Sequence, residues 1–325
     1  MKRTIALVLA LSCLCLTGCS GTTVIYQELP SSGQQQSDPQ PAPQPEEPGS
    51  GAVKTGLAIL TDTTGSDSGE EVSYEVAVAA VTVDDGGVIR SCVIDEIDSE
   101  VPIDTTGTVI GDTATALTSH RASDGDWARR AEQTARYAVG KTAAQLQNSG
   151  DNEGEELLNA VARAAEYARH MGAQADDELR LALIADHSDS TSATGSEAGR
   201  VRLNCSAAAV TFRGEIMTSC RIDSVQADVS FDAMGTVTGG VADHVKTKRE
   251  LGEDYGMKRF GGAKYEWYEQ ADHFAAYAVG KTAAQILGLA LNDGKPADAD
   301  LAASVTISVT PFQALIAAAW AQEVR

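Results

Sequence analysis

The feature of this sequence that most constrains its fold is an internal duplication. The nine residues at 137–145, YAVGKTAAQ, recur unchanged at 277–285, and matching segments extend the duplication over nearly all of residues 54–325. A repeat of more than about 100 residues has the size of a domain, whereas the units of solenoids span about 20–50 residues. We therefore expect two tandem domains, copy 1 at residues 52–175 and copy 2 at residues 176–325.

Both copies show the same order of predicted elements. A short apolar strand leads through a polar loop to a longer strand, a turn with glycine, a return strand, a long loop and an amphipathic helix. We expect these elements at 57–61, 74–83, 88–97 and 126–147, and again at 181–185, 201–212, 215–225 and 265–291. A second helix follows in each copy, from the start signal at Asn152 to a stop at Gly172, and from a capping box at Thr310 with Pro311 at the first helical position. Strand hairpins followed by helices predict an α+β fold.

The start of the chain indicates where the protein resides. Lys2 and Arg3 precede an apolar run at 5–16, and the sequence then reads LTGC, ending on Cys19. A basic start, a short apolar segment and small residues at the end are typical of a secretory signal peptide, here residues 1–18. The ending on Cys19 resembles the lipobox of bacterial lipoproteins. This resemblance implies that Cys19 is acylated, becomes the new N-terminus and anchors an extracytoplasmic protein to the bilayer of the bacterial cell.

Residues 19–51 are predicted to be a disordered linker. The segment 27–50 contains six of the nine prolines and almost nothing that could be buried, which is typical of an extended tether. Loss of residues 1–18 changes the formal net charge from −21 to −23. Such a charge argues against binding that is mainly electrostatic, either to nucleic-acid phosphates or to anionic lipid headgroups, so we expect no nucleic-acid partner.

Motifs of known chemistry are missing from the sequence. The repeated Gly140-Lys141-Thr142 lacks the earlier glycine of a phosphate-binding P-loop and follows a helix instead of a strand, so we interpret it as a packing segment. The five histidines lack metal-ligand spacing, and no nucleophile, base and orienting group come together along the chain. We therefore expect that the protein has no catalytic residues and no metal site, and that its role is binding and not catalysis.

Three cysteines remain after the signal peptide and Cys19. A two-residue turn at Arg213-Gly214 would place Cys205 and Cys220 on one face of neighbouring strands, where an oxidising compartment could join them. The other interpretation is that the cysteines are small buried apolar residues. Both interpretations stay open at this point.

Copy 2 has about twelve residues more than copy 1 between its cysteine and its Gly-Lys-Thr segment. The extra material lies within 244–270 and brings cations and aromatic rings together in an acidic chain. Such a combination suits a small anionic or planar ligand. The candidate ligand-binding residues are Lys246, Lys248, Arg249, Tyr255, Lys258 and Trp267.

The strand segment VDDGGVIRSCVID at 83–95, the Gly-Thr-Val loop after it and the following helix resemble the FMN-binding modules of bacterial envelope electron-transfer proteins. The resemblance implies a possible FMN cofactor, although the signature for covalent flavin attachment is missing from both copies. The arrangement also resembles uncharacterised bacterial surface lipoproteins. The expected function is a non-catalytic, membrane-anchored binding module for a small ligand or an envelope protein. The alternatives are a flavin-dependent electron carrier and a structural or adhesive surface protein.

Overall fold

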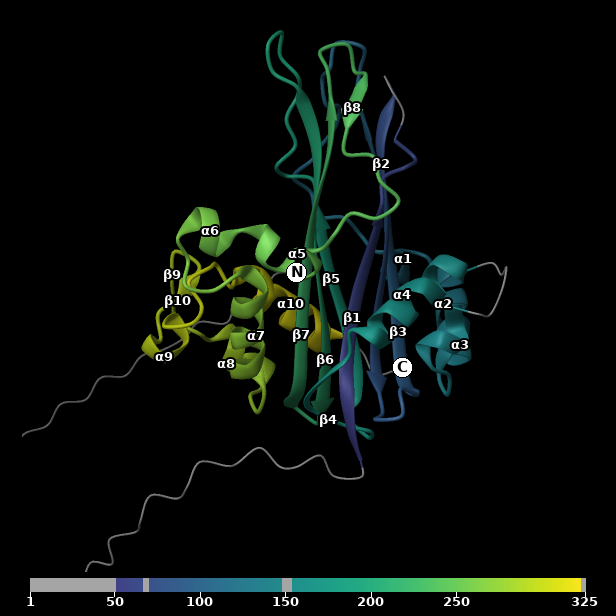
Figure 1. Cartoon of the computed structure of the whole chain (residues 1–325), viewed down its shortest axis with the longest axis vertical. Helices are drawn as coiled ribbons and strands as arrows, with labels where there is room; N and C mark the ends of the chain where they lie inside the picture. The colour runs from purple at the N-terminus through teal and green to yellow at the C-terminus, as the bar shows by residue number, and fades with distance from the viewer. Residues whose placement is uncertain (1–50, 67–69, 148–153, 323–325) are drawn as a thin grey trace, which may run out of the picture. The chain divides into compact units, whose positions relative to one another are not determined.

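Two four-stranded antiparallel sheets, one from each copy, form the centre of the fold (Figure 1). The structure is a computed structural model that describes residues 51–66, 70–147 and 154–322. The predicted signal peptide, Cys19 and nearly all of the predicted linker lie outside the described residues. The predicted α+β class is confirmed, because the described chain combines antiparallel sheets with helices in each copy.

The first sheet has the strand order β3-β2-β1-β4 and the second has the order β5-β6-β7-β8. Their strands are β1 (Ala52–Asp62), β2 (Glu71–Val83), β3 (Ile89–Pro102), β4 (Arg169–Gln174), β5 (Glu178–Asp186), β6 (Gly199–Arg213), β7 (Ile216–Phe231) and β8 (Val237–Gly239). Copy 1 adds the helices α1 (His120–Ser123), α2 (Gly125–Ala138), α3 (Ala143–Gln147) and α4 (Glu155–Glu166). Copy 2 adds α5 (Lys248–Leu251), the 3-10 turn η1 (Gly252–Tyr255), α6 (Met257–Gly261), α7 (Trp267–Ala278), α8 (Ala283–Leu287), the strand pair β9 (Leu291–Asn292) and β10 (Lys295–Pro296), α9 (Ala299–Ala302) and α10 (Thr310–Ala321).

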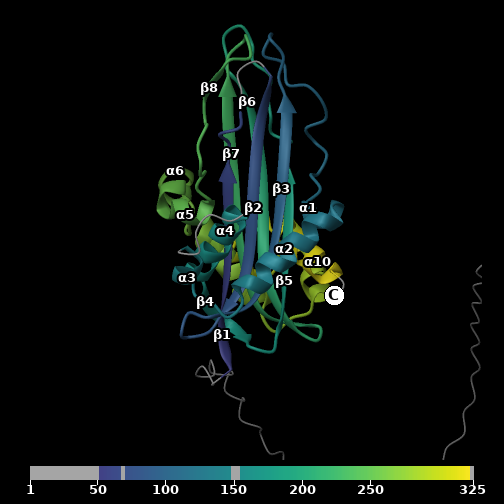
Figure 2. The ribbon, with the colours of Figure 1, turned by 90° about the vertical axis from the view of Figure 1, so that its right-hand side faces the viewer.

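The elements stack as helices, sheet, sheet and helices. One buried cluster fills the space between the two sheets, and two further clusters lie between each sheet and its own helices. Figures 1 and 2 show α2 and α4 beside the first sheet, while α7 and α10 lie beside the second. The described residues of both copies belong to one compact unit, in which the two sheets share a core.

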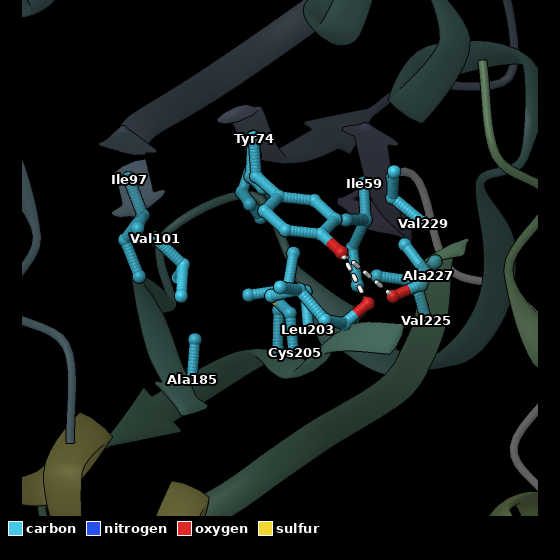
Figure 3. Close-up of a cluster of buried hydrophobic side chains, with 14 of the residues drawn as sticks. Ile59, Tyr74, Ile97, Val101, Ala185, Leu203, Cys205, Val225, Ala227 and Val229 are labelled. Carbon is cyan, nitrogen blue, oxygen red and sulfur yellow. Dashed lines mark hydrogen bonds between the residues drawn. The ribbon is translucent and has the colours of Figure 1, made fainter. Parts of the chain in front are cut away.

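The cluster between the sheets binds the copies together through polar as well as apolar contacts. Tyr74 of copy 1 is fully buried, and its hydroxyl donates to the carbonyl of Val201 in copy 2 at 2.7 Å (Figure 3). The hydroxyls of Thr55 and Ser219 lie 2.6 Å apart between β1 and β7. A buried polar atom without a hydrogen-bond partner destabilises the folded state, because its interaction with water is lost. The two sheets must therefore lie where these hydroxyl groups find their partners, which fixes the relative position of the sheets.

The repeated Gly-Lys-Thr segment has a structural role, as the sequence analysis proposed. The nitrogen of Gly140 donates to the carbonyl of Ile89, and the nitrogen of Ile89 donates to the carbonyl of Lys141, each at 2.9 Å. Met217 makes the same pair of bonds with Gly280 and Lys281. The segment therefore ties the end of a helix to the start of the return strand in both copies.

This segment also corrects the predicted helices at 126–147 and 265–291. Gly140 and Gly280 adopt φ values of 86° and 81°, which end α2 and α7 and separate them from α3 and α8. Gly172 lies inside β4 and does not stop a helix, whereas Asn152 lies outside the described residues. The helix expected at Thr310 forms as α10 with Pro311 in its first turn, but Val309 is its N-cap and no capping box forms.

Small residues on the helix-facing side of the sheets allow close approach. A Cβ atom built on Gly56 of β1 would lie 2.0 Å from the carbonyl oxygen of Ala164 in α4. Ala58, Ala77 and Ala79 continue this surface on β1 and β2.

We expect Gly56→Ala to lower the free energy of unfolding by about 3 kcal/mol, because the added methyl group must push α4 from the sheet. Chemical denaturation monitored by circular dichroism measures the change. Gly125→Ala is the matched control, since no atom lies within 4 Å of a Cβ at the first position of α2. A change of less than about 0.5 kcal/mol for Gly56→Ala would contradict the tight packing of α4 on β1.

Candidate functional site

Three of the six residues proposed for the ligand site of copy 2 come together. The Nζ atom of Lys248 lies 5.2 Å from the ring centre of Tyr255 and 5.3 Å from that of Trp267. Burial lowers the pKa of Lys248 to about 8. Tyr255 and Trp267, the two rings expected to bind a planar ligand, therefore already pack around the ammonium group of Lys248.

The other three residues lie apart from this cluster. The guanidinium of Arg249 forms an ion pair with Asp272 at 2.9 Å and donates to the carbonyl of Ile222 at 2.8 Å. Lys258 pairs with Glu269 at 3.2 Å, and Lys246 is exposed. The six residues do not line one common hollow among those found in the described part of the chain.

Sequence analysis missed a buried aspartate that anchors a short helix in each copy. The Asp95 carboxylate of β3 accepts from the hydroxyl of Ser119 at 2.8 Å and from the backbone nitrogen of Arg121 at 3.1 Å. Asp223 of β7 accepts in the same way from the nitrogen of Arg249 at 3.3 Å. Burial raises the pKa of both carboxyls, and the bonds from the helix start oppose that effect. The equal spacing of aspartate and arginine in the two copies was the sequence signal for this contact.

Two adjoining hollows of about 450 and 360 Å³ lie where the copies meet at β3 and β5. These strands are the edges of their sheets and contact each other. Arg121 and Gln322 line both hollows, so we call the combined space the seam hollow. Its walls come from α1, α2 and β3 of copy 1 and from β5 and α10 of copy 2.

Arg121 differs sharply from its counterpart in copy 2. Its guanidinium makes one weak hydrogen bond, to the carbonyl of Ile94 at 3.4 Å, and has no ion pair with any described residue. In copy 2 the carboxylate of Asp272 neutralises Arg249. Glu132 occupies the place of Asp272 in copy 1, but it pairs with Arg136 at 3.4 Å.

The other cations of the seam hollow are occupied. Arg180 holds Glu178 at 2.8 Å, donates to the carbonyl of Trp320 at 2.9 Å and stacks 5.0 Å from the ring centre of Phe212. Burial raises the pKa of the nearby Cys92 thiol to about 12, so this sulfur is protonated at neutral pH and is a poor nucleophile. The arrangement can therefore bind an anion at Arg121, and it offers no activated nucleophile at Cys92.

A row of carboxylates crosses the helix-facing side of the first sheet. Asp62 of β1 pairs in register with Glu75 of β2, which pairs with Asp98 of β3. Like charges in directly opposite positions destabilise a sheet. The row also affects Glu156, at the start of α4. Burial and the neighbouring carboxylates raise the pKa of this side chain to about 7. Asp62 and Glu156 also line an open hollow of about 520 Å³.

Copy 2 has amides at two of these three positions. Asp186 pairs in register with Asn204, which pairs with Gln226. The Gln226 amide donates to the Asn204 side chain at 3.0 Å, and the Tyr255 hydroxyl donates to Gln226 at 3.2 Å. The extra residues of copy 2 thus cover an amide row, whereas the acidic row of copy 1 has no such cover among the described residues.

The disulfide interpretation of Cys205 and Cys220 is wrong. Cys205 lies in the cluster between the sheets and Cys220 in the cluster beneath the helices, and all three described cysteines are free. The physical reason is a β-bulge, in which Thr218 is an extra residue between the pairs Phe212↔Met217 and Thr211↔Ser219. A shift of one residue moves every later side chain of a strand to the opposite face.

Comparisons with known proteins give no match. Neither the family models, nor the curated proteins, nor the solved structures contain one that matches this chain. Within the described residues, no helix is long and apolar enough to cross a membrane, and no group of three or more histidine, cysteine or acidic side chains is placed to hold a metal ion.

We expect the double variant Glu75→Asn/Asp98→Gln, which copies the amides of copy 2, to raise the melting temperature more at pH 8 than at pH 4. The pKa values of Glu75, Asp98 and Glu156 are raised in the folded state. At these three groups the folded chain therefore keeps protons that the unfolded chain releases. Their contribution to stability falls as the pH rises from about 4.5 towards the Glu156 value of about 7.

Differential scanning fluorimetry across this pH range makes the measurement. Glu197→Gln/Glu215→Gln removes the same charge from exposed positions outside the row and serves as the control. An equal gain at both pH values, or a gain of the same size in the control, would show that crowding of the row does not affect stability.

Proposed function

We propose that this protein is a lipid-anchored, non-catalytic binding protein of the bacterial cell envelope, with a small organic anion as its ligand in the seam hollow. The observation that carries the proposal is the contrast between the two repeated arginines. Arg249 is neutralised by Asp272, whereas Arg121 faces a hollow without an ion pair among the described residues. The charge of Arg121 acts on the nearby Asp95 carboxylate, but the guanidinium makes no direct ion pair among the described residues. Such a partly buried guanidinium can bind a carboxylate or phosphate group.

The walls of the seam hollow support an organic anion over an inorganic one. Val93, Ala135, Val139 and Leu179 line it together with Arg121. Small-molecule sites combine apolar walls with a few polar groups that fix orientation, and their volumes are about 300–1,000 Å³. The acidic group of the ligand would bind Arg121, and its apolar or planar body would lie against these side chains.

This proposal keeps the ligand class expected from the sequence and moves the site. The candidate residues of copy 2 are engaged in internal contacts, since Lys248 packs between Tyr255 and Trp267 and Arg249 holds Asp272. Both copies contribute to the seam hollow, so binding would depend on the fused pair and not on a single module.

The anchor proposal rests on the lipobox-like sequence that ends at Cys19. We expect Cys19→Ser to move the protein from the membrane fraction to the soluble fraction in a bacterial host, because acyl chains on the sulfur provide stable anchoring. Fractionation with immunodetection, and mass spectrometry of the N-terminal peptide, check this. Retention of the variant in the membrane fraction without acylation would contradict a lipid anchor at this residue.

We expect Arg121→Gln to weaken binding of an organic anion at least tenfold, since hydrogen bonds to a charged partner contribute about 1.5–3 kcal/mol. Benzoate, phenyl phosphate, citrate and FMN are suitable probes, screened by thermal shift and measured by calorimetry. Arg249→Gln is the matched control: it changes the equivalent arginine, should lower the melting temperature through its lost ion pair, and should leave anion affinity unchanged.

Two further variants test the role of the competing ion pair. Ala276 stands in copy 2 where copy 1 has Arg136. Arg136→Ala should free Glu132 to neutralise Arg121 and weaken binding, whereas Glu132→Ala should strengthen it. No binding of any probe, or equal losses for Arg121→Gln and Arg249→Gln, would overturn the seam site. A visible flavin band with matching added mass in the purified protein would favour the electron-carrier alternative, and a colourless protein that binds no probe would favour a structural or adhesive role.

A further inference from the structure

The extra residues of copy 2 form a defined arm at the periphery of the folded unit. We call residues 252–265 the arm. Together with Glu266 they separate α5 from α7, whereas only three residues separate α1 from Trp127, the counterpart of Trp267. The arm contains η1 and α6 and lies outside the helices that cover the second sheet (Figures 1 and 2).

The base of the arm is held firmly. The buried Glu266 carboxylate accepts from the backbone nitrogens of Met257 at 2.8 Å and Lys258 at 3.0 Å. Gln270 donates to the carbonyl of Tyr265 at 3.0 Å. The arm therefore presents its outer side chains in a fixed arrangement.

The tip of the arm combines an exposed aromatic ring with positive charge. Phe260 is 78% exposed, the largest exposed fraction among the large apolar side chains of the described chain. Arg259 and Lys264 are exposed and make no ion pair among the described residues. Lys258, by contrast, is held by Glu253 at 3.7 Å and by Glu269 at 3.2 Å, nearer the base of the arm. Arg259 lies 5.0 Å from the centre of the Phe260 ring.

We infer that the tip of the arm docks on a bilayer that contains anionic phospholipid, with Phe260 inserted at the headgroup boundary and the basic side chains against the phosphates. Aromatic rings partition into this boundary, and basic side chains are attracted to anionic lipid. Charge complementarity favours this occupant, because a mature chain of formal charge −23 is repelled from such a surface elsewhere. The inference builds on the proposed anchor, which would keep the bilayer within reach of the arm and make weak docking effective.

The test uses the chain from Ser20 onward, which lacks Cys19 and contains every described residue. Vesicles of phosphatidylcholine with about one third phosphatidylglycerol, and vesicles of phosphatidylcholine alone, are the probes in a co-sedimentation assay. We expect binding to the anionic vesicles, little binding to the neutral ones, and a loss of binding as ionic strength rises.

The variants distinguish the effect of side chains at the tip of the arm on vesicle binding from the effect of the protein's net charge. Arg259→Gln/Lys264→Gln should lower the partition coefficient at least fivefold, and Phe260→Ser at least fivefold, at unchanged melting temperature. The control Arg129→Gln/Arg130→Gln removes equal charge from exposed sites elsewhere and should stay within twofold of wild type. Phe260→Trp should show a blue shift of fluorescence, relative to wild type, on anionic vesicles alone.

Several results would overturn the inference. They are the absence of binding to anionic vesicles, equal losses in the arm and control variants, and an unshifted Phe260→Trp spectrum. The assay needs neither an acylated Cys19 nor an occupied seam hollow. A negative result would therefore overturn only the lipid docking of the arm, and would not bear on the lipid anchor or the ligand site.

Discussion

Each sheet of this protein must bury two apolar faces, and the rest of the structure follows from this constraint. The helices of each copy cover one face, and the sheet of the other copy covers the second. A single copy would expose the large residues that now form the cluster between the sheets, among them Ile59, Tyr74 and Leu203. Duplication therefore supplies a partner surface, and the hydroxyl bonds of Tyr74 and Thr55 to copy 2 fix how the two surfaces meet.

The two copies share one architecture but differ in the surroundings of equivalent side chains. The anchoring of a short helix by Asp95 and Asp223 is kept in both, because it positions the helix layer on the sheet. The arginine beside each aspartate has acquired a different environment, an ion pair in copy 2 and an open hollow in copy 1. The repeat thus provides an internal control for the proposed function. One chain contains an arginine that is ion-paired with an aspartate, Arg249, and an equivalent arginine without an ion pair among the described residues, Arg121.

The two copies also differ on the helix-facing side of their sheets, where the arm lies in copy 2 and the acidic row lies in copy 1. In copy 2 the amides of Asn204 and Gln226 are covered by Tyr255 from the arm. In copy 1 no described segment covers the carboxylates of Glu75 and Asp98 in this way, and burial together with the neighbouring carboxylates raises the pKa of Glu156. The copy with the insertion therefore has a covered row with one carboxylate, and the other copy has an open row with three.

The sequence by itself determined the duplication, the α+β class and, in each copy, the order of the three long strands and the main helices after them, because periodicity and turn residues are local and occur twice. It did not predict β4, β8 or the short helices α1, α5 and α6. It also predicted that residues from 244–270 would gather cations and aromatic rings, and Lys248, Tyr255 and Trp267 do so. Only the tertiary structure decided the face of Cys205 and Cys220, since one bulged residue reverses a whole strand. It also decided that Arg121 makes no ion pair among the described residues. The i,i+4 pair of Glu132 with Arg136 follows from spacing on α2, but only the packing of α1 and α2 on β3 shows that no carboxylate forms an ion pair with Arg121.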